Sequence, residues 1–366
     1  MIRRSAHRLP RPVYEVLRLL FILILAFGIN SLILIAIGKN PLDVYGELFY
    51  GSLAGTYSLA KTLRWMTLLL LCGTSAAIAF NGGVLNLGID GQLYMGAMAA
   101  TVAGIYGQNI PHLPLILLCM LAGALAGSLW GVFAGFLNVK CGANMVVITL
   151  MMNYIATLFT EWCIFTPLYT EAGVAAKSTA NIAQQAHLSV LIPGTQVTTA
   201  LFAALLVLVA AAVWIQYTAS GFETRIVDKN PLFASTMGIS VGKKTLVLML
   251  ASGAVAGLAG ALEIIGVQHR FVSSFISGVG FDGMVVSMLA GNNMLLLPVA
   301  AFFMGVMESG SASLEMFAGI PRAMAEVLMG IIILFVTVDL KRPKEFLTKM
   351  LGHVCSPGPE SARRSR

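Results

Sequence analysis

The stretch Phe80-Asn81-Gly82-Gly83-Val84-Leu85-Asn86-Leu87-Gly88-Ile89-Asp90-Gly91-Gln92 lies between two apolar runs and combines four glycines with four polar side chains besides its apolar residues. Unwound backbone at membrane depth is tolerated only where protein or a water-filled cavity covers it. Two interpretations stay open. The stretch is either a plain cytoplasmic turn after the second predicted span or part of a solute pathway or its inner gate. In the second case the candidate pathway residues are Asn81, Asn86, Asp90 and Gln92.

The composition of the chain is typical of a membrane protein. Of its 366 residues, 58% are hydrophobic and only 11% are charged, whereas soluble domains carry about 25% charged residues. A water-soluble fold of this size could not bury so much apolar surface, but lipid accepts it. The five cysteines are scattered, without a CxxC pattern, so we expect small buried residues and no metal site. The sequence thus predicts an all-α polytopic membrane protein.

Long apolar runs divide the chain into predicted membrane spans. A helix that crosses the hydrocarbon needs about 20 apolar residues, and the sequence predicts about ten such helices. They lie near residues 16–38, 62–80, 84–107, 113–138, 143–166, 197–217, 245–267, 272–291, 294–312 and 322–340. Since the number is even, both termini lie on one side. Both are basic, so the positive-inside rule assigns them to the cytoplasm.

The net charge of +7 gathers at the two ends of the chain. This distribution favours a membrane topology, with membrane lipid as the neighbour, over a nucleic-acid partner. The first apolar run is too long for the core of a signal peptide, so we expect it to stay as a span. The predicted divisions are a cytoplasmic basic arm (1–15), a transmembrane domain (16–340) with a periplasmic segment (167–196) and a cytoplasmic loop (218–244), and a cytoplasmic basic tail (341–366).

Glycines recur every four residues in two of the predicted spans. Small residues at this spacing let two helix backbones approach closely, which is the main packing device in lipid. We therefore assign a helix-packing role to Gly123, Gly127, Gly131, Gly253 and Gly257.

A short sequence pattern occurs in both halves of the chain and weakly indicates an internal repeat. Gly83-Val84 precedes Asp90-Gly91, and Gly278-Val279 precedes Asp282-Gly283. Five predicted spans separate the two copies, so their orientations would be opposite. Inverted repeats with glycine-broken helices are a transporter design that puts the pathway at the repeat interface. Chance similarity between glycine-rich segments is the alternative, and it stays open.

A polar pair lies in the middle of the predicted span 143–166. Asn153 and Tyr154 carry an amide and a phenol, which can bind hydroxyl groups or a base without the desolvation cost of a charge. We add both to the candidate solute pathway. Carboxylates in or near the spans are expected to pair with Arg270, Arg322 or helix N-termini. Those considered are Asp90, Glu161, Glu263, Asp282, Glu308 and Glu326.

The longest charged stretch between two spans begins at Phe222 and ends at Ile239. Asn230 can cap a short helix with Pro231 at its first position, and Gly238 can end it. The sequence therefore predicts a short amphipathic helix across the cytoplasmic face. It contains no G-x-x-x-x-G-K-[ST] or HExxH motif and no Ser/His/Asp grouping inside the spans. We expect neither nucleotide hydrolysis nor another enzymatic activity in this chain.

Five blocks of the sequence together resemble the inner-membrane permeases of nucleoside and simple-sugar ABC importers. This family belongs to the group of ribose and branched-chain amino-acid permeases. The blocks stand in the family's order and cover most of residues 60–340: Phe80–Gln92, Gly142–Ala156, Asn230–Ile239, Ala256–Glu263 and Phe281–Pro321. The chain departs from the family at Asp228, where a glycine is usual, and at Met145, where an acidic residue is frequent.

The resemblance implies a fold similar to that of the vitamin B12 permease and a location in the bacterial inner membrane. It also implies three protein partners: a cytoplasmic ABC ATPase that binds the ATP, a second permease chain of the same or a different sequence, and an extracytoplasmic solute-binding protein. The chain itself needs no cofactor. The residues that would form the helix coupled to the ATPase are Asn230, Pro231, Ala234 and Gly238.

These observations lead to one expected function and three alternatives. We expect alternating access of a neutral, hydroxyl-bearing solute, with nucleosides favoured, powered by ATP hydrolysis on another subunit. A ribose-like sugar is the alternative solute. The rivals from other classes are an ion-coupled secondary transporter, which predicts buried carboxylates at mid-span, and a non-transporting scaffold or receptor.

Overall fold

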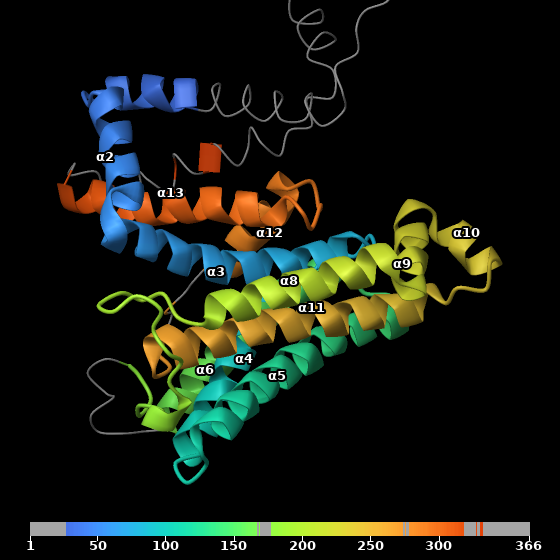
Figure 1. Cartoon of the computed structure of the whole chain (residues 1–366). Helices are drawn as coiled ribbons and strands as arrows, with labels where there is room; N and C mark the ends of the chain where they lie inside the picture. The colour runs from blue at the N-terminus through green and yellow to red at the C-terminus, as the bar shows by residue number, and fades with distance from the viewer. Residues whose placement is uncertain are drawn as a thin grey trace, which may run out of the picture.

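The computed structural model describes residues 27–166, 168, 177–273, 275, 278–317, 327, 330 and 331. This part of the chain is mostly helical, with isolated β-bridges and no strand among its residues. The long helices run side by side as a bundle (Figure 1). The predicted basic arm 1–15, the tail 341–366 and nearly all of the last predicted span lie outside the described residues.

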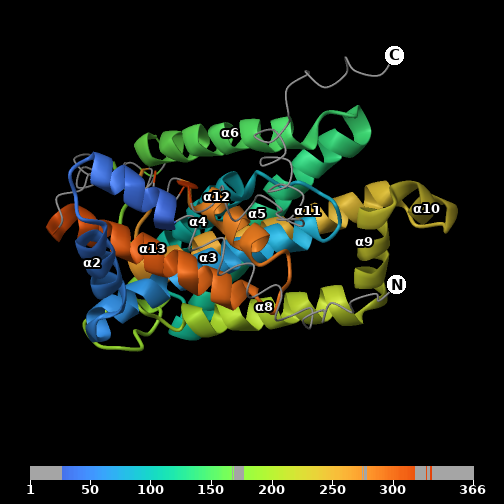
Figure 2. The same cartoon turned by 90° about the horizontal axis from the view of Figure 1, so that it is seen from above.

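Six helices in the described part of the chain are long and apolar enough to cross a membrane. They are α3 (Gly55–Phe80), α5 (His112–Cys141), α6 (Met145–Phe165), α8 (Ala200–Tyr217), α11 (Val241–Glu263) continued by the π-helical turn η2 (Ile264–Gln268), and α13 (Leu297–Phe317). Seen from above, α6 and α8 lie on opposite sides of the bundle with α3 and α11 between them (Figure 2). The protein is therefore a multi-pass membrane protein, but the predicted count of about ten spans is not confirmed.

Two predicted spans are interrupted helices. In the predicted span 84–107, residues 84–88 are not helical, and α4 (Ile89–Tyr106) begins only after them. Among the described residues of the predicted span 272–291, only α12 (Val279–Leu289) is helical. A helix of this length reaches about 16 Å, about half of the hydrocarbon thickness. Glycines with positive φ precede both helices, Gly83 at +70° and Gly278 at +88°, and this conformation cannot continue a right-handed helix.

Shorter helices complete the described fold. An apolar helix, Phe27–Ala36, lies within the predicted span 16–38. The next helix, α2 (Pro41–Leu53), was not predicted from the sequence. Its signal was present, because Asn40 accepts a hydrogen bond from the Leu42 N–H and a proline follows at the first helical position. The remaining elements are α9 (Ala219–Lys229), α10 (Pro231–Thr236) and the 3₁₀ turn η1 (Gln184–Ala186).

Glycines bring α5 and α11 into backbone contact. A Cβ on Gly127 would lie 2.6 Å from the Gly257 Cα, and a Cβ on Gly123 would lie 2.9 Å from the Gly257 carbonyl oxygen. Gly131 likewise faces the Met249 carbonyl, and Gly253 faces the Gly127 carbonyl. No side chain larger than hydrogen fits at these positions, so dispersion contacts between the two backbones hold this pair of helices together.

The two central helices pack in matching ways. α3 contacts α12 and α13, while α11 contacts α4 and α5. Where α3 and α11 cross, the Ser75 hydroxyl donates to the Ser252 carbonyl at 2.8 Å, and the Ser252 hydroxyl donates to the Ser75 carbonyl at 2.9 Å. A two-fold axis through the crossing would produce such a reciprocal pair. The start of α4 lies beside this crossing.

Candidate functional site

The residues between α3 and α4 return into the bundle and are held there by a buried amide network. The Asn86 amide donates to the Gln92 Oε1 at 3.0 Å and to the Ser252 Oγ at 2.8 Å. Its Oδ1 accepts from the Gly88 N–H at 3.0 Å and from the Gln92 amide at 3.1 Å. Asn86 and Gln92 are buried. Asn86 bonds the segment to Ser252 of α11, and Gln92 bonds to Asn86, so both side chains hold the segment in place.

Asn153 ties α6 to the same segment. Its Oδ1 accepts from the Gly91 N–H, and its amide donates to the Leu87 carbonyl, both at 2.8 Å. Gly91 lies in the first turn of α4, and Leu87 lies just before the helix. This one side chain therefore satisfies an N–H that the start of the helix leaves unpaired and a carbonyl of the preceding segment. A Cβ on Gly91 would lie 2.9 Å from the Asn153 Oδ1. The glycine therefore permits the contact.

The N-termini of α4 and α12 meet at Asp90. Its Oδ1 accepts from the Gly280 N–H at 2.6 Å, and α12 has no other side-chain cap at its own N-cap residue, Gly278. A carboxylate at a helix N-terminus is stabilised by the unpaired N–H groups and the helix dipole. A Cβ on Gly280 would lie 2.5 Å from the Asp90 backbone nitrogen, so the two helix ends approach as closely as their backbones allow.

Asn81 lies away from this meeting point. Its amide donates to the Ala77 carbonyl at 2.8 Å and to the Asn292 carbonyl at 2.9 Å. Asn292 follows α12 and has a positive φ of 59°. Asn81 therefore joins the end of α3 to the turn that follows α12.

A pocket of about 220 Å³ opens where α4, α6 and α12 meet. Its lining residues are Asp90, Tyr94, Leu150, Asn153, Tyr154, Thr157, Gly278 and Phe281. Of the six candidate pathway residues, Asp90, Asn153 and Tyr154 line this pocket, whereas Asn81, Asn86 and Gln92 do not. Tyr154 is 68% exposed, so its phenol is the most accessible of these polar groups.

Five lining residues were absent from the candidate list, namely Tyr94, Leu150, Thr157, Gly278 and Phe281. Tyr94 lies one helical turn after Asp90, and Thr157 lies one turn after Asn153, so helical spacing could have found both. Tyr94 packs edge-to-face against Phe271 and Phe275, with ring centroids 6.0 and 5.6 Å apart. The pocket thus combines aromatic rings with neutral polar groups.

Two ion pairs lie elsewhere in the described part of the chain, Arg64 with Glu263 and Lys244 with Glu223. Glu263 pairs with Arg64 of α3 and accepts from the Gln268 amide at 3.2 Å. The expectation that Arg270 or Arg322 would supply the partner of Glu263 is wrong, because Arg64 reaches it across the crossing of α3 and α11. Asp90 does face a helix N-terminus, as expected.

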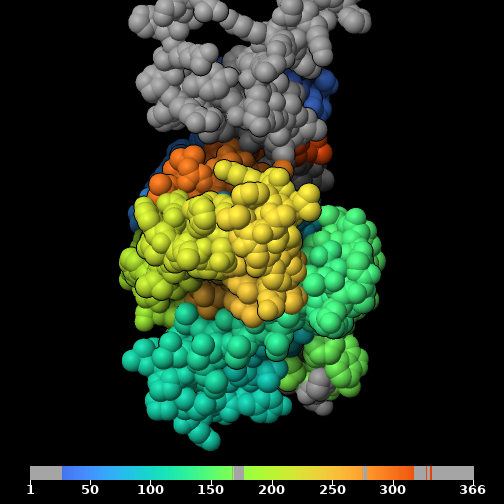
Figure 3. Space-filling view, turned by 90° about the vertical axis from the view of Figure 1, so that its right-hand side faces the viewer, coloured from blue at the N-terminus to red at the C-terminus, as the bar shows by residue number. Residues whose placement is uncertain are grey.

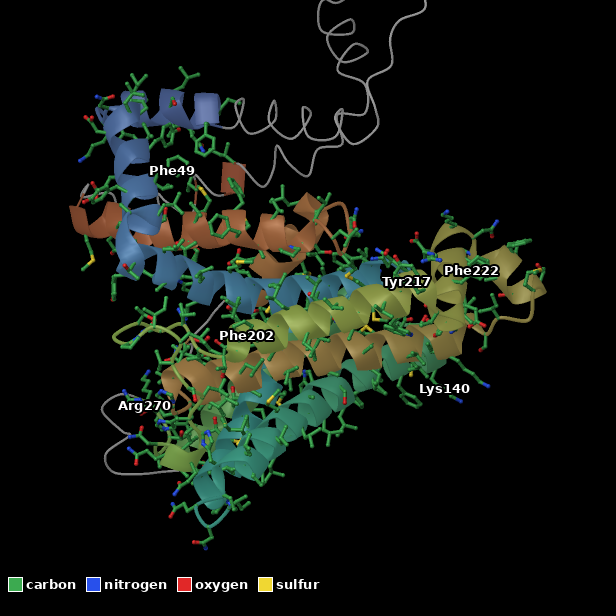
Figure 4. All side chains as sticks on the ribbon, in the orientation of Figure 1. Phe49, Lys140, Phe202, Tyr217, Phe222 and Arg270 are labelled. Atoms are coloured by element: carbon green, nitrogen blue, oxygen red, sulfur yellow. The ribbon has the colours of Figure 1, made fainter. Side chains whose placement is uncertain are left out.

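The short helix predicted after Asn230 is confirmed as α10. The Asn230 Oδ1 accepts from the Phe233 N–H at 3.0 Å, Pro231 opens the helix, and Gly238 follows it with φ +81°. The Ile239 N–H donates to the Ala234 carbonyl at 3.0 Å, which satisfies a group left over at the helix end. α9 and α10 stand at one end of the bundle, with Phe222, Tyr217 and Lys140, while Arg270 lies at the other end (Figure 4).

The exposed side chains of α10 differ from the four residues expected to couple to an ATPase. Asn230, Pro231 and Gly238 shape the helix, and Ala234 is buried. Leu232, Phe233 and Met237 are 77%, 51% and 64% exposed. Figure 3 looks onto this end of the bundle, where the atoms of α9 and α10 (yellow) protrude. We name Leu232, Phe233 and Met237 the α10 apolar surface.

Comparison with known proteins gives the family. A family model described as the permease component of the branched-chain amino acid transport system matches residues 58–337. The chain belongs to this permease family. The permease is 32% identical over 340 residues to the guanosine ABC transporter permease protein NupP of Bacillus subtilis (strain 168), covering 92% of this chain and 94% of that protein.

Two further relatives bear on the solute. The permease is 31% identical to the nucleoside ABC transporter permease protein NupB of Lactococcus lactis, covering 88% of this chain and 91% of that protein. It is 29% identical to the glucose ABC transporter permease protein TsgB13 of Haloferax volcanii, covering 85% and 84%. ABC permeases are transport components whose ATPase activity lies in a separate subunit. The family therefore excludes an ion-coupled secondary transporter and implies an ATPase partner.

Proposed function

We propose that this permease translocates neutral polar solutes, with nucleosides favoured, by alternating access through the pocket between α4, α6 and α12. The observation that carries the proposal is the meeting of two interrupted helices at Asp90, in a pocket lined by this carboxylate and by aromatic and neutral polar side chains. Aromatic faces and neutral hydrogen-bonding groups suit a nucleobase and its ribose. The names of the relatives NupP and NupB agree with this solute class. A simple sugar is the alternative, which the glucose-transporter relative favours.

We assign two kinds of role to the candidate pathway residues. Asp90, Asn153 and Tyr154 bound the pocket, and the Tyr154 hydroxyl is the group that contacts the solute directly. Asn81, Asn86 and Gln92 hold the segment that forms the pocket wall. This division follows from their hydrogen bonds, since Asn86 and Gln92 bond to each other and Asn81 bonds to backbone.

The matched packing of the two central helices supports an inverted repeat. In this scheme α3, α4 and α5 correspond to α11, α12 and α13. The contacts of α3 with α12 and α13 then repeat those of α11 with α4 and α5. The reciprocal bonds between Ser75 and Ser252 would lie on the pseudo-two-fold axis. This is the arrangement expected from the resemblance to the vitamin B12 permease.

The partners follow from the positions of the exposed surfaces. The α10 apolar surface is the docking site for the ABC ATPase, which makes the α9–α10 end cytoplasmic. In this orientation the loop 218–244 and both basic termini (1–15 and 341–366) are cytoplasmic, and the segment 167–196 faces the periplasm and a solute-binding protein. A second permease chain covers the open side of the pocket next to Tyr154. The membrane is the bacterial inner membrane, and residues 16–340 form the permease domain.

One experiment tests the function and the docking surface together. Cells that express the whole importer are supplied with radiolabelled guanosine or ribose, with and without the ATPase gene. We expect guanosine uptake that depends on the ATPase, and a loss of uptake and of ATPase co-purification in the double variant Leu232→Ser, Phe233→Ser. Thr236→Ala is the matched control on the same helix and should behave as the unmodified protein. Uptake that persists without the ATPase gene would refute the proposal.

A further inference from the structure

The segment from Asn81 to Asp90, here called the re-entrant segment, is attached to both ends of α12. Asp90 accepts from the Gly280 N–H near the start of the helix. Asn81 donates to the Asn292 carbonyl just beyond its end. The segment and the helix therefore lie antiparallel and are joined twice. A displacement of the segment must carry α12 with it or break these two hydrogen bonds.

α9 packs directly on the two glycines that open the re-entrant segment. A Cβ on Gly82 would lie 3.0 Å from the Thr224 Cγ2, and a Cβ on Gly83 would lie 3.2 Å from the Asp228 Oδ1 and 3.3 Å from its Cα. Thr224 and Asp228 are four residues apart in one helix, so they share a face. This face of α9 rests on the backbone of Gly82-Gly83, with no side chain of the segment in between.

α9 is also connected at both of its ends. At its start, the Thr218 Oγ1 accepts from the Gly221 N–H, and the Arg225 guanidinium donates to the Ile215 carbonyl at 2.6 Å. These bonds anchor α9 to the end of α8. At its other end, Asn230 leads directly into α10 and its apolar surface. A force on α10 therefore reaches α9, one face of which lies on the two glycines. Lys244 of α11 also pairs with Glu223 of α9 and donates to the Ser220 Oγ at 3.0 Å.

We propose that the contact of Thr224 and Asp228 with Gly82-Gly83 passes the movement of the ATPase-docking helix to the re-entrant segment and α12. The inference rests on the proposed function, since it needs a moving ATPase at α10. It adds a pair of positioning residues, Gly83 and Asp228, which touch no solute. Their contact must stay closed while α9 moves.

A wedge at Gly83 is the first test. Gly83→Asn adds a side chain against Asp228, and asparagine tolerates positive φ better than most residues. We expect the complex to assemble and to hydrolyse ATP, but guanosine uptake to fall by at least about tenfold, which corresponds to about 1.4 kcal/mol. Gly38→Asn is the matched control, because Gly38 also has positive φ (+81°) and would meet nothing within 4 Å.

A second substitution distinguishes the contact from backbone strain. Adding Asp228→Gly to Gly83→Asn removes the opposing Cβ and carboxylate and should restore most of the uptake. Normal uptake in Gly83→Asn alone, an equal loss in Gly38→Asn, or no recovery in the double variant would overturn the proposal.

A disulfide between residues 83 and 228 gives a complementary test, because it holds the contact closed instead of forcing it apart. A Cβ on Gly83 would lie 3.9 Å from the Asp228 Cβ, within the range of about 3.5–4.5 Å that disulfides require. Gly83→Cys with Asp228→Cys is made in a variant in which Cys141 and Cys355 are replaced by serine. If the two residues move together, the oxidised and reduced forms import guanosine at the same rate. A block on oxidation would overturn the proposal.

The proposed transport function and the transmitting contact at Gly83 can be refuted separately. If the unmodified importer takes up no guanosine or binds no ATPase, the proposed function fails. If the unmodified importer is active and the Gly83→Asn variant is equally active, only the transmitting contact is refuted. ATP hydrolysis measured in the same membranes separates these outcomes, because the wedge should leave hydrolysis in place while uptake is lost.

Discussion

The two interrupted helices that meet at Asp90 are held in different ways. The start of α4 is fixed by the amides of Asn86, Gln92 and Asn153, which bond to one another, to Ser252 and to backbone on both sides of Ile89. Among the described residues, the Asp90 carboxylate is the side chain that caps the start of α12, after a glycine with φ +88°. One wall of the pocket is therefore held by three buried amides, and the start of the other is capped by the Asp90 carboxylate.

The different hydrogen bonding at the starts of α4 and α12 indicates how each pocket wall takes part in the transport cycle. Opening the start of α4 would leave several buried amide and backbone groups without partners, each at a cost of about 1–3 kcal/mol. At the start of α12, the described side chains provide the hydrogen bond to Asp90, and Asn81 bonds just beyond the end of the helix. We expect the start of α4 to keep its shape as the re-entrant segment moves, and α12 to follow the segment through its bonds to Asp90 and Asn81. The predictions below test this asymmetry, in order of decreasing effect.

The largest effect is expected at Asp90. In Asp90→Asn the charge that caps α12 is lost, and a hydrogen bond to a charged group contributes about 1.5–3 kcal/mol. Guanosine uptake should therefore fall by about tenfold to a hundredfold, with the permease still present in the membrane at normal amounts. Asp43→Asn serves as the control, since Asp43 is an exposed aspartate in the first turn of α2. Unchanged uptake in Asp90→Asn would mean that α12 does not depend on this cap.

The second prediction concerns the wall held by the buried amides. Asn153→Ala leaves the Gly91 N–H and the Leu87 carbonyl without their side-chain partner. We expect the free energy of unfolding to fall by about 2–4 kcal/mol, measured as a lower melting temperature of the purified permease in detergent. A variant that melts like the unmodified protein would show that Asn153 is not a structural brace, and the comparison between the two walls would fail.

The sequence alone indicated where the candidate site lies, but not which of its side chains line the pocket and which hold the segment in place. The glycines and polar residues between Phe80 and Gln92 suggested either a plain turn or part of a solute pathway, and α4 begins within that stretch. What could not be predicted was the direction of each side chain. Asn86 and Asp90 lie four residues apart, yet one bonds to α11 and the other to α12, because residue 86 precedes the helix and does not share its periodicity.

Other elements differed in how well local rules described them. α10 was predicted from a cap, a proline and a terminal glycine, because all three act within one helical turn. The span 272–291 was predicted as a full helix, since its composition is apolar, but α12 covers only its second part. Hydropathy measures compatibility with lipid and says nothing of whether a glycine-flanked segment stays helical. The partner of Glu263 was likewise set by the crossing of α3 and α11, which no local pattern encodes.

The third prediction uses the neighbour of Asn153. Tyr154 is 68% exposed, and its phenol borders the pocket. Tyr154→Phe removes one neutral hydrogen-bonding group, which contributes about 0.5–1.5 kcal/mol, so the KM for guanosine should rise by about two- to tenfold. The maximal rate and the melting temperature should stay unchanged. A lower maximal rate at constant KM would place Tyr154 with the moving parts and not with the solute.

The smallest effect is expected at Asn81, where the re-entrant segment meets the far end of α12. Asn81→Ala removes the hydrogen bond to the Asn292 carbonyl, and we expect a cost of about 1 kcal/mol and a few-fold decrease in uptake. Asn138→Ala is a close control, because the Asn138 amide donates to the Ala143 carbonyl at 2.8 Å after α5 without touching α12. Both variants should lose similar stability, but only Asn81→Ala should lose uptake. Equal uptake in the two would mean that α12 is carried by Asp90 alone, which would place the moving contact entirely at the start of the helix.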